Sequence, residues 1–264
     1  MRFPVDRSRG RTARRLALGL LCIAFAAPVL AKEQVLLCFE KKIVAPWRLA
    51  NQTGLNFDLL AIVEARMNIK FNYQALPWKR CLAKMQTNEV DGAFSVSFTE
   101  DRLVFGGYPG GAEPDMRKKL HDSRYMLVRR KGSALDWDGK QLSKLDGPII
   151  FQLGYSVGDL LRRMNIKTEE SNDSLNVVAH RILTGNVAGA ALYDSDATIV
   201  MRMPLAAQLE LAPLPLIEKP YFVMFSHALL KRRSQLAERI WQEIEEARSS
   251  PDYLRKARAA GVLP

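Results

Sequence analysis

An alternation of short apolar runs with amphipathic stretches, which starts at Gln34 and continues to the C-terminus, constrains the fold most. The apolar runs predict strands at 35–39, 69–75, 92–97, 125–129, 148–152, 187–192 and 221–226. Apolar residues at helical spacing predict helices at 57–67, 78–87, 156–164, 174–184 and 234–248, and a terminal helix between Ser250 and Gly261. Asn56 is a possible N-cap of the first helix. Strands that alternate with helices are typical of an α/β protein.

Two polar segments divide this pattern. Residues 106–122 hold glycines, prolines and mixed charges, which are typical of a long surface loop, and residues 131–147 are polar and rich in turn residues. The strands and helices before and after them form two series of similar length. We therefore expect two lobes followed by a helical tail.

The N-terminus has the composition of a secretion signal. Its first fifteen residues carry six arginines and one acid, Asp6, and the next fifteen carry no charge. Val29 and Ala31 place small residues where a signal peptidase requires them, so we expect cleavage after Ala31 and export to the periplasm. An uncleaved anchor is the alternative, although fifteen apolar residues fall short of the roughly 20 that span a bilayer.

Cleavage changes the charge and leaves two cysteines. Removing six arginines and one aspartate lowers the formal net charge from +11 to +6, so we expect no nucleic-acid partner. No later apolar run approaches spanning length, so we expect no membrane span in the mature chain.

Cys38 and Cys81 remain as a pair in an oxidising compartment, and we expect a disulfide worth about 4 kcal/mol at most. Two buried thiols are the alternative.

The sequence offers no catalytic or metal-binding motif. His121, His180 and His227 lie far apart, without the spacing of a metal-ligand pair. A nucleophile elbow, a phosphate-binding loop and a dinucleotide fingerprint are all missing from the sequence. We therefore expect no cofactor, no metal and no catalytic residue.

The candidate ligand residues lie where predicted strands end, which is where open α/β sheets bind ligands. Ser97 ends one strand, Thr99 is placed to start a helical turn, and Arg102 can offer a bidentate guanidinium to a carboxylate. A capped turn with a solvated arginine is the alternative.

Other candidates are weaker on their local sequence. The turn 152–156 presents small and hydroxyl groups at a helix start, and Asp194 follows a strand but is equally suited to cap the next helix. Glu40 ends the first strand within a charged turn. Trp47 and Trp78 are either stacking surfaces in a cleft or core anchors.

Five motifs, taken in order, resemble the amino-acid-binding class of periplasmic solute-binding proteins that serve ABC transporters. They are GLNFDLL at 54–60, LPWKRCL at 76–82, NEVDG at 88–92, SFTEDR at 97–102 and QLGYS at 152–156. The resemblance implies an α/β, two-lobed periplasmic-binding-protein type II fold with two crossing hinge strands. Lobe I would hold residues 32–124 and 226–264, and lobe II residues 125–225.

The resemblance also implies roles for individual residues. Arg102 would hold the ligand carboxylate, with Ser97 and Thr99 beside it, and Tyr155 and Ser156 would assist from lobe II. This chain departs from the family pattern around Pro46. The family residue that usually binds the amino group of the solute aligns here with Tyr193, one position before Asp194. The altered set of ligand residues is typical of a divergent branch.

We therefore expect a periplasmic monomer that closes over a small carboxylate-bearing solute, amino-acid-like, and delivers it to an ABC permease. One alternative is an enzyme on the same fold, similar to cyclohexadienyl dehydratases, for which only Glu40 or Asp194 is available as a general acid. The other is a sensor or accessory receptor that signals to a membrane partner.

Overall fold

The computed structural model describes Met1 and residues 32–263. The expected signal peptide, apart from Met1, lies outside the described residues. The chain from Lys32 onward forms one compact unit. No helix within residues 32–263 combines the length and the apolar character that a membrane span requires.

One sheet of nine strands runs through this unit in the order β2-β1-β3-β11-β4-β9-β7-β8, with β10 paired to β4. The strands are β1 (Glu33–Glu40), β2 (Ile69–Leu76), β3 (Gly92–Ser97), β4 (His121–Arg130), β7 (Ile149–Gln152), β8 (Thr168–Ser171), β9 (Gly189–Tyr193), β10 (Leu209–Leu211) and β11 (Ile217–Phe225). A separate hairpin joins β5 (Asp136–Trp137) to β6 (Leu142–Ser143).

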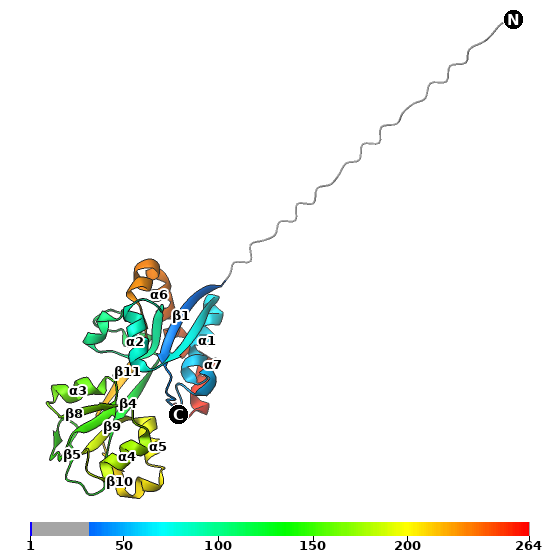
Figure 1. Cartoon of the computed structure of the whole chain (residues 1–264). Helices are drawn as coiled ribbons and strands as arrows, with labels where there is room; N and C mark the ends of the chain where they lie inside the picture. The colour runs from blue at the N-terminus through cyan, green and yellow to red at the C-terminus, as the bar shows by residue number, and fades with distance from the viewer. Residues whose placement is uncertain (2–31, 264) are drawn as a thin grey trace. The chain divides into compact units, whose positions relative to one another are not determined.

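The α-helices pack on the two ends of the sheet. They are α1 (Leu55–Met67), α2 (Trp78–Gln86), α3 (Val157–Arg163), α4 (Leu175–Leu183), α5 (Asp194–Val200), α6 (His227–Arg248) and α7 (Pro251–Ala259). Lobe I contains β1, β2 and β3 with α1, α2, α6 and α7, and lobe II contains β7, β8 and β9 with α3, α4 and α5 (Figure 1).

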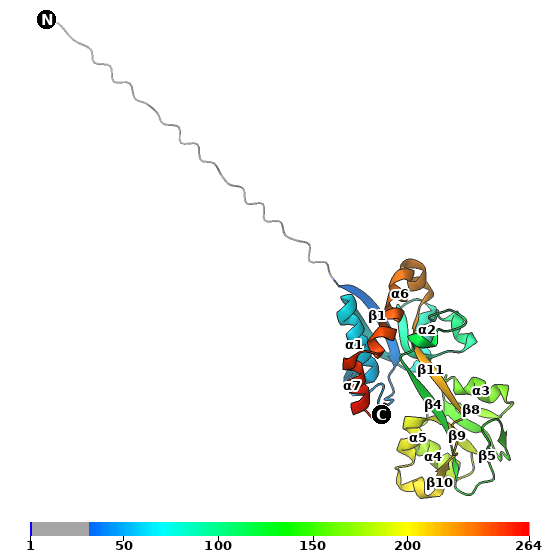
Figure 2. The ribbon, with the colours of Figure 1, turned by 180° about the vertical axis from the view of Figure 1, so that it is seen from behind.

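Two antiparallel strands connect the lobes, as expected. β11 pairs with β3 over Tyr221–Phe225 and with β4 over Ile217–Tyr221, while β4 continues beside β9 from Tyr125. Both strands run between the two groups of helices (Figure 2). The lobe boundaries expected from the sequence fall inside β4 and at the end of β11, and we retain them as a proposal.

Several helix ends follow from their sequence. Ser174 and Ser250 cap α4 and α7 by accepting hydrogen bonds from main-chain N–H groups three residues later. Gly185 and Gly261 follow the same two helices with φ of +76° and +71°, as glycines that end helices do.

Two helix starts differ from the prediction. Asn56 is not an N-cap: α1 begins after Gly54, whose φ is +106°, and Asn56 is buried in the first turn. A Cβ on Gly54 would lie 2.9 Å from the main-chain oxygens of Pro46 and Trp47, so only glycine allows this approach. α6 begins at His227, where Ser226 caps it, but Arg233 has a non-helical φ of −144°, so the predicted helix 234–248 is the second segment of α6 after this kink.

The core of lobe I fixes the strands whose ends reach the site. Phe39 of β1 packs edge-to-face on Phe57 of α1, with ring centroids 5.3 Å apart, and lies 5.0 Å from Phe94 of β3. Pairs of this kind contribute about 0.5–1.5 kcal/mol beyond their buried area. The disulfide between Cys38 and Cys81 is confirmed, and it ties the end of β1 to α2.

Candidate functional site

A small inner cavity of about 20 Å³ lies where the crossing strands pass between the lobes. It is lined by Glu40, Arg48, Trp78, Ser95, Ser97, Arg102, Tyr125, Tyr155, Tyr193 and Tyr221. Glu40, Ser97 and Tyr193 are the last residues of β1, β3 and β9. The cavity therefore lies at the carboxyl ends of strands from both lobes, where ligand sites of open α/β sheets form.

Arg102 lies in a short 3₁₀ turn, Glu100–Val104, and is 5% exposed. Thr99 is the N-cap of this turn, as expected, although its buried hydroxyl has no partner among the described residues. Arg102 Nη1 donates to the main-chain oxygen and the hydroxyl of Ser97, both at 2.8 Å, and Nη2 donates to the Gly154 oxygen at 3.1 Å. The guanidinium carbon lies 5.3 Å from the centre of the Trp78 ring. No carboxylate in residues 32–263 pairs with Arg102, so three neutral contacts hold a full positive charge.

Gly154 is one of the points at which the lobes meet. Its main-chain oxygen accepts hydrogen bonds from Arg102 and from Trp78 Nε1, each at 3.1 Å. Its φ is +76°, and a Cβ there would lie 3.2 Å from both Trp78 Cδ1 and Lys79 Cγ. Nearby, the hydroxyls of Ser97 and Ser156 lie 2.7 Å apart. The Arg102 turn of lobe I is thus fastened to the 152–156 turn of lobe II.

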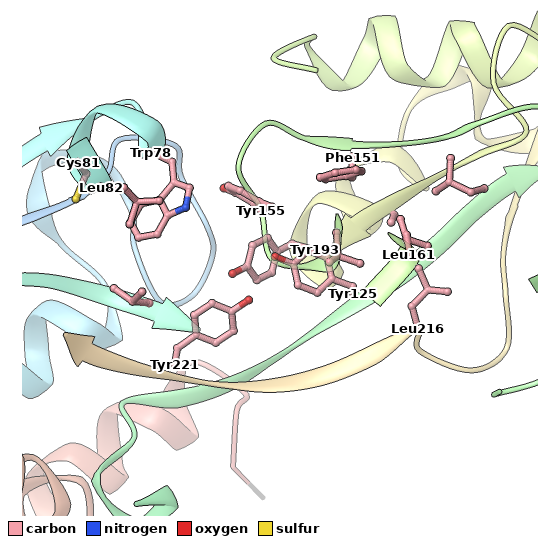
Figure 3. Close-up of a cluster of buried hydrophobic side chains, with 14 of the residues drawn as sticks. Trp78, Cys81, Leu82, Tyr125, Phe151, Tyr155, Leu161, Tyr193, Leu216 and Tyr221 are labelled. Atoms are coloured by element: carbon pink, nitrogen blue, oxygen red, sulfur yellow. The ribbon is translucent and has the colours of Figure 1, made fainter. Parts of the chain in front are cut away.

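Four tyrosines form the opposite wall, facing Trp78 (Figure 3). The rings of Tyr125 and Tyr193 lie 4.7 Å apart, and Tyr155 and Tyr221 pack against Tyr193 at 5.3 and 5.7 Å. Burial raises the pKa of all four phenols, so they stay neutral at physiological pH. The hydroxyl of Tyr155 is buried without a partner in the described chain, so it remains available to a ligand, whereas the side chain of Tyr221 interacts with Tyr125 and Tyr193.

Arg48 also lines the cavity, and the sequence reasoning missed it. It is 4% exposed, its Nε is buried, and its side chain has no hydrogen-bond or ion-pair partner in residues 32–263. Its backbone is fixed by two hydrogen bonds of 2.8 Å with Val44, across a turn that contains Pro46. The sequence departs from the resembled pattern around Pro46, in this same turn, but that departure does not single out Arg48.

Ser95 is a second residue that sequence reasoning missed. It has φ of +60° in the middle of β3, where the pairing with β11 shifts between Phe222 and Val223. A serine in the left-handed region is strained, and bulges of this kind commonly turn a side chain toward a site. Here Ser95 becomes part of the cavity wall.

The structure brings five of the expected ligand residues to the cavity and places the others elsewhere. Glu40, Trp78, Ser97, Arg102 and Tyr155 line it. Ser156 adjoins it through the Ser97 hydroxyl, and Thr99 lies in the Arg102 turn.

Trp47 and Asp194 line a different groove, of about 480 Å³. Trp47 stacks on His121 there, with ring centroids 4.1 Å apart. Asp194 lies 3.9 Å from Arg124 and is the first residue of α5 rather than its cap.

Two wider grooves flank the inner cavity. One, of about 580 Å³, shares Glu40 and Trp78 with it, and the other, of about 340 Å³, shares Arg102 and Tyr155. Lys42 crosses between the lobes beside the first groove and pairs with the buried Asp196 at 2.8 Å. Trp78 and Arg102, which both donate to the Gly154 oxygen, each line the inner cavity and one of these grooves.

The described residues contain no group of three histidine, cysteine, aspartate or glutamate side chains that is suited to hold a metal ion. Glu40 is the only carboxyl group on the wall of the inner cavity, and its Oε1 accepts a hydrogen bond from the Lys42 main chain at 3.2 Å. The site therefore combines two arginines, one glutamate and neutral hydroxyls between aromatic rings. It is suited to binding a small charged solute.

No protein-family model and no curated protein sequence matches the chain. A histidine kinase sensor domain with similarity to periplasmic binding proteins is similar in structure, with a TM-score of 0.68 at 12% identity over 88% of this chain and 98% of that one. An ancestral arginine-binding protein bound to glutamine has a TM-score of 0.64 at 16% identity, over 88% and 99% of the two chains. The GluR0 ligand-binding core from Nostoc punctiforme, in complex with L-glutamate, has a TM-score of 0.63 at 14% identity, over 86% and 99%.

The TM-scores and the coverage of both chains establish the fold. The chain has the two-lobed type II fold of periplasmic binding proteins, with β4 and β11 as the crossing strands, as the sequence resemblance implied. The expected fold class is confirmed. The low identities agree with a divergent branch.

Proposed function

We propose that this protein is an extracytoplasmic solute-binding protein that closes over a small carboxylate-bearing, amino-acid-like solute and delivers it to an ABC-type permease. One observation carries the proposal: the buried guanidinium of Arg102 lies between the lobes without a carboxylate partner in residues 32–263. A buried charge is normally paired, so a ligand carboxylate is the group that would complete the site. The fold supports the proposal, because its solved relatives include proteins bound to glutamine and L-glutamate.

Binding requires the lobes to separate and close again. A water molecule needs roughly 10–15 Å³ of free space, so a cavity of about 20 Å³ does not admit a solute of amino-acid size. Separation at Gly154 frees one N–H group of Arg102 and the indole N–H of Trp78. A carboxylate then replaces a neutral carbonyl as acceptor, and such charge-assisted bonds are about twice as strong. The crossing strands β4 and β11 are the natural hinge.

A thermal-shift screen of amino acids, dicarboxylates, polyamines and short peptides tests this proposal, followed by calorimetric titration of every hit. A solute at a hundred times its Kd adds about 2.7 kcal/mol of stability, which such a screen detects. Arg102→Ala should raise the Kd of the hit roughly 30-fold or more, since truncating a buried charged pair costs about 2–5 kcal/mol. The exposed Arg202→Ala is the matched control and should bind like wild type.

Two results would reject the proposal. One is a screen in which no carboxylate-bearing compound stabilises the protein. The other is a carboxylate ligand whose affinity is the same for wild type and for Arg102→Ala.

Export is part of the proposal. We infer that a signal peptidase removes residues 1–31, so that the working chain starts at Lys32, where the described fold begins. N-terminal sequencing of protein recovered from the periplasm should therefore start at Lys32. A periplasmic product that keeps Met1 would show that this segment is retained.

A ligand sensor is the second candidate function. The observation in its favour is the fold of the histidine kinase sensor domain, which aligns with a TM-score of 0.68. Both functions use the same ligand site, so the partner distinguishes them. Deletion of the gene should abolish uptake of the identified solute if the chain serves a permease, and should leave uptake intact if it serves a sensor.

An enzyme on the same fold is the third candidate, because Glu40 places one buried carboxyl group in the cavity as a possible general acid. Prephenate and arogenate are the substrates to assay. Turnover that is lost in Glu40→Gln would establish this function, and no turnover at high protein concentration would remove it.

A further inference from the structure

The buried guanidinium of Arg48 has no role in the function proposed so far. Arg48 is as buried as Arg102, but it makes no hydrogen bond or ion pair with any side chain in residues 32–263. An isolated buried charge costs several kcal/mol, and proteins normally pair such groups or expose them. The cost is explained if a ligand supplies the missing anion.

The protein groups around Arg48 do not neutralise it. Burial lowers the pKa of the neighbouring His121 well below its ordinary value, and Arg48 and Lys119 lower it further, so the imidazole stays neutral. Tyr155 on the cavity wall is a neutral phenol. Glu40 lines the same cavity but lies beyond ion-pair distance from Arg48. The cavity wall therefore carries two positive charges, from Arg48 and Arg102, and one negative charge, from Glu40.

Resting on the proposed function, we infer that Arg48 is a second anion-binding group and that the solute carries two carboxylates, one for each arginine. An amino dicarboxylate is the class that matches all three charges, because its ammonium group pairs with Glu40. The hydroxyl of Tyr155 supplies a neutral hydrogen-bonding group, and the aromatic rings cover the carbon chain. The structure thus selects against a solute with a single carboxylate, which would leave Arg48 unpaired.

Two pairs of probes that differ in one charge test this inference: L-glutamate against L-glutamine, and L-aspartate against L-asparagine. Calorimetric titration should give at least one acid a Kd 30-fold or more below that of its amide. In Arg48→Gln this ratio should fall to within about threefold, because the acid loses affinity and the amide does not. The control Arg202→Gln should keep the wild-type ratio. Glu40→Gln should weaken L-glutamate more than it weakens glutarate, which has no ammonium group.

The inference is overturned if neither acid binds more tightly than its amide, and this includes the case in which neither acid binds at all. It is also overturned if Arg48→Gln leaves the ratio of amide Kd to acid Kd unchanged. An ordinary monocarboxylate amino acid that binds through Arg102 and ignores Arg48 would overturn it while leaving the proposed function intact. Failure of every carboxylate in the wider screen would reject both.

A melting experiment without added solute separates binding from a structural role for Arg48. If the Arg48 guanidinium serves only to bind a ligand, it forms no stabilising ion pair in the protein without solute. The Tm of Arg48→Gln should then equal or exceed that of wild type. A fall in Tm of several degrees would mean that Arg48 supports the fold, and this would overturn the inference.

Discussion

Reduction of the Cys38–Cys81 disulfide should destabilise the protein by an amount that the structure allows us to calculate. The two residues are 43 positions apart in the sequence, and the bond joins the end of β1 to α2. The chain-entropy model gives about 4 kcal/mol at 25 °C for a loop of this length. With an m-value of about 4–6 kcal/mol per molar guanidinium chloride, the unfolding midpoint should fall by about 0.7–1 M.

The assay is equilibrium unfolding in guanidinium chloride, followed by circular dichroism, on oxidised and on fully reduced wild type. The two samples have identical side chains, so the difference isolates the cross-link. The Cys38→Ala/Cys81→Ala variant should lose somewhat more, because it also leaves cavities in the core. Equal midpoints for oxidised and reduced protein would refute the reasoning.

Three further predictions follow from the site and its surroundings. Gly154→Ala should lower the free energy of unfolding by about 1 kcal/mol and weaken solute binding, because alanine is strained at φ +76° and its Cβ meets Trp78; unchanged affinity in titration would contradict this. Burial lowers the pKa of His121 well below 6.5, so as the pH falls the unfolded chain takes up this proton before the folded protein does. The free energy of unfolding should therefore fall as the pH drops below about 6.5. Melting at a series of pH values should show a smaller pH dependence of stability for His121→Phe than for wild type, and an equal pH dependence would disprove the assignment. Burial lowers the pKa of Lys219 to about 8, so as the pH rises the folded protein loses this proton before the unfolded chain does. The free energy of unfolding should therefore rise between about pH 8 and 10. Lys219→Met should abolish that rise in pH-dependent melting, and its persistence would implicate another group.

The strands and helices of lobe I follow from their sequence because each carries an apolar run or an apolar face that becomes buried, and β3 is buried along its whole length. β1, β2 and β3 were predicted within two residues of their ends. In lobe II, β8 was missed because Thr168–Ser171 is polar throughout and pairs only with β7 at the sheet edge, so it carries no apolar alternation. α5 was missed because its first three residues, Asp194, Ser195 and Asp196, are polar, so the segment shows no apolar repeat at helical spacing.

The residues that line the inner cavity were likewise predicted only in part from the sequence. The rule that ligand residues follow strand ends located Glu40, Ser97 and Arg102, because it depends on position within a strand alone. It did not locate Arg48, whose burial depends on how the turn after β1 folds against other segments. The tyrosines were also missed as a group, apart from Tyr155, because they lie on β4, the turn after β7, β9 and β11 and meet only once the sheet order is known.

The most direct test of the central claim is hydrogen exchange with and without the tightest ligand from the screen. The site joins residues 97–102 of lobe I to residues 152–156 of lobe II through Arg102, Gly154 and the paired serine hydroxyls. Both segments should therefore become protected together when wild type binds the solute, and neither should do so in Arg102→Ala. Protection that is confined to the separate groove around Trp47 and Asp194 would contradict the account.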